Sequence, residues 1–293
     1  MHSRKQAFGL LLITFFIWGS VYVGGRLVSG DFPPPLLACL RCLTAMLPLG
    51  FMARKHRQVK IQPEDRKWFL LVGFLAHFFN MQMIQLGIAI TGASTAALLN
   101  AMTPVAVTLL AAVILKERIT PIKLLCLALA IAGTVVITFD ASMGVDPLGV
   151  GAIMAGVVAF GAASVIMRRL TATYPSALVT AVSMAVSLIF NIPVGIYTAL
   201  TREVRVTPFG VAVVLYLGIV CAGVGQFCWT RCLSVLPAST CSLFYPLQPV
   251  FSALLGSVLL HETFTPAFFV GLLLVSLDIV LNTAEARRQP AEP

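Results

Sequence analysis

Residues 93–121 read ASTAALLNAMTPVAVTLLAAVILKERITP, and residues 238–266 read ASTCSLFYPLQPVFSALLGSVLLHETFTP. The two stretches align without a gap at a shift of 145 residues and are identical at thirteen of 29 positions. The identical positions include the AST start, a central proline (Pro104 and Pro249), one glutamate and the final Thr-Pro pair. Apolar composition alone would match Leu with Leu by chance, but it would not keep these residues in register. The chain therefore contains an internal repeat, and a repeat of this length bears on the whole architecture.

A weaker match, at a shift of 142 residues, joins the beginnings of the same two halves. It pairs Trp18 with Phe160, Gly19 with Gly161 and Arg26 with Arg168. We therefore expect a first repeat over residues 1–140 and a second over residues 141–293.

The composition is that of a membrane protein. Hydrophobic residues make up 59% of the 293 residues and charged residues only 11%, whereas soluble domains carry about 25% charged residues. The mean hydropathy is +0.96. A transmembrane helix needs about 20 apolar residues, and ten segments qualify, roughly 7–28, 34–53, 67–90, 93–115, 120–139, 147–168, 175–199, 208–230, 237–260 and 265–283. The sequence predicts an all-α polytopic membrane protein of ten transmembrane helices.

The net charge of +9 is distributed as a topology signal. The N-terminus, every second connection and the C-terminal tail together hold sixteen Lys and Arg residues, six of them within residues 54–67. The remaining connections hold two, Arg202 and Arg205. Because basic connections stay on the cytoplasmic side, we expect both termini in the cytoplasm. No basic domain stands apart from the apolar segments, so we expect no nucleic-acid partner.

Five helices in each half make the second half enter the membrane in the opposite sense. The charges agree, since Lys116 and Arg118 in the first repeat are replaced by His261 and Thr263 at the equivalent outer position. Inverted repeats are typical of secondary transporters, whose substrate site lies near mid-membrane between the repeats.

The WGS motif of the first helix (18–20), the helix that runs from AST to the proline, and the LKERITP ending (115–121) carry a family resemblance. With them, the chain resembles the EamA family of the drug/metabolite transporter superfamily over essentially its whole length. The resemblance implies a ten-helix inner-membrane carrier, often an exporter of amino acids or other metabolites, with YddG-like aromatic amino acid exporters as one branch. The second copy of the ending, LHETFTP (260–266), departs from the family pattern, so no role is carried over to it.

Candidate cavity residues begin on the first helix, where Trp18, Tyr22 and Arg26 follow at i+4 spacing on one stripe. Trp18 lies about 16 Å along the helix from its start, too deep for an interfacial aromatic belt, so we expect Trp18 and Tyr22 to line a cavity, with plain helix packing as the alternative. Arg26 lies near the outer end, where it either snorkels to the interface or binds a substrate carboxylate. We also place Phe160 and Ser164 of the sixth helix in the cavity.

The third helix presents His77, Asn80, Met81 and Gln85 on one face. Polar groups inside a membrane are costly and usually face the bundle interior or a cavity. We therefore expect this face to line the cavity as well, with hydrogen-bonded packing as the alternative for His77.

Prolines interrupt the fourth and ninth helices, where each removes a backbone hydrogen bond. Pro104 follows the candidate cavity residue Asn100 by four positions, and Pro246 and Pro249 stand beside Tyr245 and Gln248, two further candidates. We expect a matched pair of hinges with freed carbonyls at mid-membrane, or ordinary kinks that serve packing.

Two further charges lie inside apolar segments, Arg41 on the second helix and Asp278 on the tenth. Each is read either as a structural pair or anchor or as a proton-coupling group, and whether they or His77 titrate during transport stays open. The run CLRC (39–42) and the other cysteines show no convergent metal ligands, so we expect no metal, no cofactor and no catalytic residues.

The function predicted is a secondary transporter rather than an enzyme. It would export small metabolites, above all amino acids with aromatic or apolar side chains, by alternating access across the bilayer, with coupling to a proton gradient left open. A multidrug carrier of lipophilic cations is the alternative among transporters. A channel and a membrane-embedded lipid-modifying enzyme are the alternatives from other classes.

Overall fold

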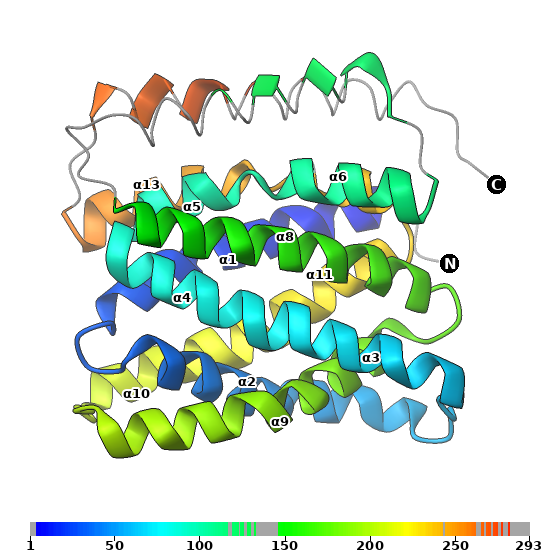
Figure 1. Cartoon of the computed structure of the whole chain (residues 1–293), viewed down its shortest axis with the longest axis horizontal. Helices are drawn as coiled ribbons and strands as arrows, with labels where there is room; N and C mark the ends of the chain where they lie inside the picture. The colour runs from blue at the N-terminus through cyan, green and yellow to red at the C-terminus, as the bar shows by residue number, and fades with distance from the viewer. Residues whose placement is uncertain are drawn as a thin grey trace.

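The computed structural model describes residues 4–116, 146–242 and 244–261, with short runs and single residues in 119–132 and 265–281. All regular structure in this part of the chain is helical, and eight helices are long and apolar enough to cross a membrane. Large apolar side chains on the spans, such as Leu47, Val113 and Leu200, are exposed, as expected for surfaces that face lipid. The chain is a multi-pass membrane protein (Figure 1). The eight spans are Gln6–Leu27, Pro34–His56, Pro63–Thr91, Ala93–Ile114, Pro147–Leu170, Ser176–Thr201, Pro208–Leu233 and Ala238–Leu259.

The spans expected over residues 120–139 and 265–283 fall for the most part outside the described residues. Asp278 lies there too. Eight of the ten expected spans are therefore observed, and the other two stay a prediction.

Four spans are built on uninterrupted α-helices, α1 (Arg4–Leu27), α2 (Pro34–Ala53), α8 (Pro147–Leu170) and α9 (Ser176–Thr201). A proline stands at or directly before the start of α2, α8 and α9. Pro147 opens α8, and the side chain of Asp146 accepts a hydrogen bond of 2.8 Å from the Leu148 amide. A first-turn proline loses nothing there, because its missing N–H would have no partner inside the helix.

Numbered in the order of the ten expected segments, Pro147–Leu170 is the sixth span, Pro208–Leu233 the eighth and Ala238–Leu259 the ninth. The third and eighth spans each contain a π-helical segment that the sequence pattern does not predict. The third consists of α3 (Arg66–Val72), the π segment η3 (Gly73–Phe79) and α4 (Asn80–Thr91). The eighth consists of α10 (Pro208–Leu215), the π segment η5 (Tyr216–Gly225) and α11 (Gln226–Leu233). At the repeat shift of 145 residues, η3 falls within η5. The same irregularity thus occurs at equivalent places in the two halves.

The fourth and ninth spans are each divided into two helices. The fourth consists of α5 (Ala93–Asn100) and α6 (Thr103–Ile114), and the ninth of α12 (Ala238–Ser242) and α13 (Leu247–Leu259). The breaks again lie at equivalent positions of the repeat. The two spans also end alike, since Lys116 (φ 57°) and His261 (φ 52°) are the non-glycine residues with positive φ in the described part of the chain.

The prolines lie in the first turn of the second helix of each pair, where the missing N–H is harmless. Pro104 belongs to the first turn of α6 and has no N–H to donate to the Asn100 carbonyl. That carbonyl instead accepts a hydrogen bond of 2.7 Å from the Thr103 hydroxyl. In the ninth span, the Tyr245 carbonyl accepts 2.9 Å from the Gln248 amide. The carbonyls expected to be freed by Pro104 and Pro249 therefore have local donors.

The helices α4 and α8 pack closely and run in opposite directions. Asn80, at the start of α4, lies against Gly156 in the middle of α8, whereas Ile90 and Thr91 at the end of α4 lie against Gly149 near the start of α8. Figure 1 shows that α8 also runs opposite to α1.

Two connections from opposite halves of the chain meet at one end of the bundle. Tyr174, between α8 and α9, donates 2.7 Å to Asp65 Oδ2 and accepts 3.1 Å from the Gln62 amide. The hydrogen bond to the Asp65 carboxylate raises the pKa of the Tyr174 hydroxyl. Beside them, the ring of Trp68 lies between Lys67 and Arg169, whose charged groups are 5.5 and 5.0 Å from it. This end also carries the basic run of residues 54–67.

Candidate functional site

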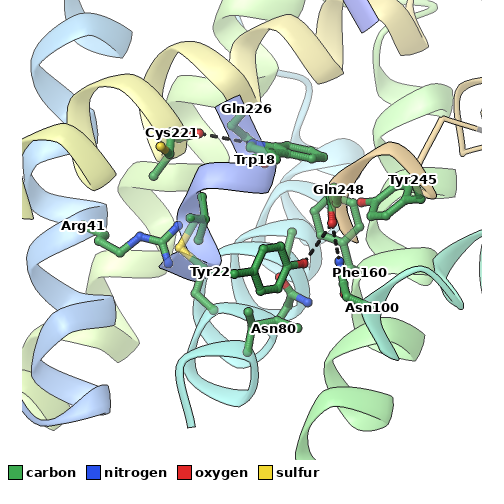
Figure 2. A pocket seen from close by; sticks show the side chains of 15 residues that line it. Trp18, Tyr22, Arg41, Asn80, Asn100, Phe160, Cys221, Gln226, Tyr245 and Gln248 are labelled. Atoms are coloured by element: carbon green, nitrogen blue, oxygen red, sulfur yellow. Dashed lines mark hydrogen bonds between the residues drawn. The ribbon is translucent and has the colours of Figure 1, made fainter. Parts of the chain in front are cut away.

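A pocket opens among the spans, as Figure 2 shows. It leaves about 550 Å³ free of protein atoms including its mouth, of which about 70 Å³ admits the centre of a water molecule. Its lining comprises four aromatic residues, four amides, one charge and six smaller or apolar residues: Trp18, Tyr22, Phe160, Tyr245; Asn80, Asn100, Gln226, Gln248; Arg41; and Val21, Ala76, Met81, Ile84, Cys221, Ala222.

Aromatic rings form one wall of the pocket. The ring centroids of Trp18 and Phe160 are 5.8 Å apart with an interplanar angle of 83°, and those of Phe160 and Tyr245 are 6.2 Å apart at 65°. Behind them, Phe15 and Trp229 lie 4.9 and 5.7 Å from the Tyr245 ring. These are the tilted and edge-to-face arrangements that aromatic pairs prefer. The wall is therefore fixed by ring packing and offers an apolar surface to an occupant.

A hydrogen-bonded group of three residues joins the two interrupted spans. Gln248 Oε1 accepts 2.8 Å from the Tyr22 hydroxyl and 3.0 Å from Asn100 Nδ2. Asn100 ends the helix before the first break, and Gln248 lies in the first turn after the second. The breaks are thus linked across the pocket, with α1 held to both through Tyr22.

The π segments place further polar groups at the pocket. Trp18 Nε1 donates 3.2 Å to the carbonyl of Cys221, which lies inside η5. Gln226 follows η5 directly, and Asn80 follows η3 directly and donates 2.9 Å to the Gly156 carbonyl. Both segments therefore deliver an amide side chain to the lining, and π-helical turns are frequent at functional sites.

Arg41 brings the single charge in the lining, although only 5% of it is exposed. Its Nη1 donates 2.9 Å to Gln85 Oε1, and its Nε has no hydrogen-bond partner among the described residues. None of the fifteen lining residues is a carboxylate. A buried charge without a counter-charge is costly, and the lining residues supply none to this guanidinium.

Eight of the twelve cavity residues expected from the sequence line this pocket, namely Trp18, Tyr22, Asn80, Met81, Asn100, Phe160, Tyr245 and Gln248. The spans that line it are the first, third, fourth, sixth, eighth and ninth, with the second added through Arg41.

The other four expected residues lie outside the lining. Arg26 is exposed and donates 2.7 Å to the Ala89 carbonyl at the end of α4. Gln85 stands behind Arg41 as its acceptor. His77 and Ser164 are fully buried, and neither the imidazole nitrogens nor the Ser164 hydroxyl has a partner among the described residues.

Sequence reasoning left Arg41 undecided and did not select Gln226, Val21, Ala76, Ile84, Cys221 or Ala222 as cavity residues. Gln226 had a usable signal, since an amide inside an apolar span is costly and tends to face a cavity. The repeat shift of 145 residues also pairs it with Met81, which was selected. The small or apolar residues carry no such signal. Among the described residues, no group of three His, Cys, Asp or Glu side chains forms a metal site.

Comparisons with known proteins agree with this architecture. The model of the EamA-like transporter family matches residues 6–139 and 147–284. An uncharacterized transporter from Clostridium kluyveri is 22% identical, over 97% of this chain and 95% of its own length. A probable terminal-alkyne amino-acid exporter from Streptantibioticus cattleyicolor is 26% identical, over 99% and 98%. A crystal structure at 24% identity superimposes with a TM-score of 0.73, covering 99% of this chain and all of its own, and shows the same fold.

Proposed function

This chain belongs to the EamA-like transporter family and is a multi-pass membrane transporter, and we propose that it exports amino acids by alternating access around the pocket of Figure 2. The observation that carries the proposal is the bond between Asn100 and Gln248. It connects two interrupted helices, one from each half of the chain, at the pocket wall. Discontinuous helices that meet at a central site are typical of secondary transporters.

The repeat provides the mechanical basis of the proposal. We propose ten helices arranged as two inverted repeats, residues 1–140 and 141–293. The matching π segments, helix breaks and positive-φ residues support the repeat, and the opposite directions of α1 and α8 support the inversion. The distribution of Lys and Arg supports both termini in the cytoplasm, and we propose the bacterial inner membrane as the location.

The helix breaks are the proposed hinges. Pro104 and Pro249 each lack the N–H of one regular helical bond across the break, and Pro246 directly precedes α13. Each break is therefore held by fewer regular helical hydrogen bonds than the helices beside it. Rocking one repeat on the other would then exchange access to the pocket between the two sides of the membrane.

The substrate proposed is an amino acid with an aromatic or apolar side chain. The aromatic wall supports an apolar side chain, and the name of the Streptantibioticus cattleyicolor relative supports amino acids as a class. A lipophilic cation would also suit the aromatic wall. The charge of Arg41 and the lack of a lining carboxylate favour the amino acid over the cation.

Counterflow in proteoliposomes tests the proposal. The purified full chain is reconstituted, the vesicles are loaded with one of a panel of amino acids, and uptake of the same labelled compound is followed with and without a pH gradient. We expect counterflow of at least one aromatic or branched-chain amino acid and none in protein-free vesicles. Absence of counterflow across the whole panel would overturn the amino acid assignment, and acceleration by the pH gradient would establish proton coupling.

A further inference from the structure

We propose that the pocket recognises its substrate through a carboxylate at Arg41 and has no matching charged site for an ammonium group. The substrate class is then a small monocarboxylate with an apolar or aromatic body, in which the amino group is dispensable. This inference rests on the proposed transport through the same pocket and specifies its chemistry.

The geometry of Arg41 provides the first step. The residue comes from α2, is almost fully buried, and is anchored through one nitrogen, Nη1, to Gln85 Oε1 at 2.9 Å. Its Nε remains without a partner among the described residues. A guanidinium presents five N–H donors in a planar fork that matches a carboxylate. Gln85 therefore orients the group while leaving donors for a ligand.

The charge balance of the lining provides the second step. Arg41 is the one ionised side chain among the lining residues, and the other polar groups there are amides, phenols, an indole N–H and a thiol, all of them neutral. A cation that enters a low-dielectric pocket beside a guanidinium is repelled, whereas an anion is attracted. Charge-assisted hydrogen bonds to a carboxylate are also stronger than neutral ones. The pocket therefore favours an acid over the corresponding amine.

The arrangement of the walls provides the third step. In Figure 2, Arg41 extends into the pocket from the side opposite Phe160 and Tyr245, with Tyr22 between them. The hydroxyl of Tyr22 is engaged by Gln248 at 2.8 Å. A ligand with its carboxylate at Arg41 would thus direct an apolar body towards the rings.

Three ligands with the same phenyl ring test the carboxylate and the ammonium group one at a time. They are L-phenylalanine, which carries both groups, 3-phenylpropionate, which carries the carboxylate, and 2-phenylethylamine, which carries the ammonium group. Each is titrated against the purified full chain in detergent while the unfolding temperature is recorded, and each competes against labelled L-phenylalanine in counterflow. We expect the two acids to raise the unfolding temperature and to compete, and the amine to do neither. In Arg41→Gln, the half-maximal concentration of both acids should rise by about 10- to 100-fold, the loss of one charge-assisted hydrogen bond.

Arg168→Gln is the matched control. Like Arg41, Arg168 donates a hydrogen bond through Nη1, in this case to the Leu233 carbonyl at 2.7 Å. Unlike Arg41, it does not line the pocket. Acid binding in this variant should match that of the unmodified chain. Arg41→Lys, which keeps the charge and loses the fork, should fall between the unmodified chain and Arg41→Gln.

Equal binding of the amine and the acids, or unchanged acid binding in Arg41→Gln, would overturn the inference. If Arg41→Gln does not fold, the ligand series on the unmodified chain decides alone. Counterflow of amines or lipophilic cations without acids would overturn carboxylate recognition while leaving a transporter. Absence of counterflow and of thermal shifts with every compound would overturn both this inference and the proposed function.

Discussion

Trp18 and Cys221, which lie in opposite halves of the chain, are joined by a hydrogen bond of 3.2 Å from the indole nitrogen to the backbone carbonyl. The carbonyl belongs to the π segment η5, and the indole ring belongs to the aromatic wall. One side chain therefore does two things. It lines the pocket and it ties α1 to the irregular part of the eighth span.

These two roles of Trp18 can be separated by substitution. Trp18→Phe keeps an aromatic ring but removes the donor, so we expect a loss of about 1 kcal/mol in the free energy of unfolding and partial counterflow. Trp18→Ala also removes the ring and should abolish counterflow while the protein still inserts into the membrane. Unfolding temperature, size-exclusion chromatography and counterflow measure these effects. Normal transport kinetics in Trp18→Ala would remove this residue from the site.

The side-chain oxygen of Gln248 accepts hydrogen bonds from two buried donors. Replacing Gln248 should therefore show how much these two bonds contribute to stability. In Gln248→Leu, the Tyr22 hydroxyl and Asn100 Nδ2 lose their shared acceptor, which should lower the free energy of unfolding by more than about 2 kcal/mol. A double-mutant cycle provides the control, because Tyr22→Phe should cost less in the Gln248→Leu background than alone. If the two substitutions lower the free energy of unfolding additively, the hydrogen bond between Tyr22 and Gln248 contributes nothing to stability.

Two glycines of α1 form a matched pair for helix packing. A Cβ atom added to Gly19 would lie 2.6 Å from Phe251 Cβ and 3.2 Å from the Gln248 carbonyl, whereas nothing lies within 4 Å of one added to Gly9. Gly19→Ala should therefore destabilise the protein by about 1–3 kcal/mol through overpacking. Gly9→Ala should be neutral or stabilising, since alanine favours a helix by up to about 1 kcal/mol. Similar unfolding temperatures for the two variants would contradict the close contact of α1 with α13.

The Tyr174–Asp65 bond predicts a pH dependence. The hydrogen bond to the carboxylate raises the pKa of the Tyr174 hydroxyl, so the bond stabilises the folded state below the ordinary tyrosine pKa of about 10 and loses this effect as the pH rises through the raised value. Thermal unfolding of the unmodified chain and of Tyr174→Phe checks this. The difference in their unfolding temperatures should be constant between about pH 7 and 9 and should shrink above about pH 10. A difference that grows with alkaline pH would contradict the assigned donor.

The sequence predicts the spans well because the length and apolarity of a membrane crossing are strong signals. It also predicts most of the pocket, since the i+4 stripe of Trp18 and Tyr22 and the polar residues beside Pro104 and Pro249 mark faces that lipid would not accept. The π segments are not predictable in this way. A helix that is apolar on nearly all sides keeps the same composition whether or not its register shifts by one residue.

Charged residues show the other limit of sequence reasoning. The position of Arg41 along its span gives its depth but not its direction, and the structure turns it towards Gln85 and the pocket. Arg26 had the same chemistry and lies on the same stripe as Trp18, yet it reaches the Ala89 carbonyl instead. Which arginine faces the cavity depends on how α1 and α2 pack against α4, and no local pattern encodes that packing.

The segments η3 and η5 set the angular register of the helices α4 and α11, which begin directly after them. A π-helical turn holds one residue more than an α-helical turn, and each residue of an α-helix turns the chain by about 100°. If the residues of Gly73–Phe79 were wound as a regular α-helix instead, each would turn the chain further, and Asn80 and Met81 would rotate away from the pocket without any change of side chain. The same rewinding of Tyr216–Gly225 would turn Gln226 away. The winding of these two segments, and not only the identity of the residues after them, therefore decides which side chains line the pocket.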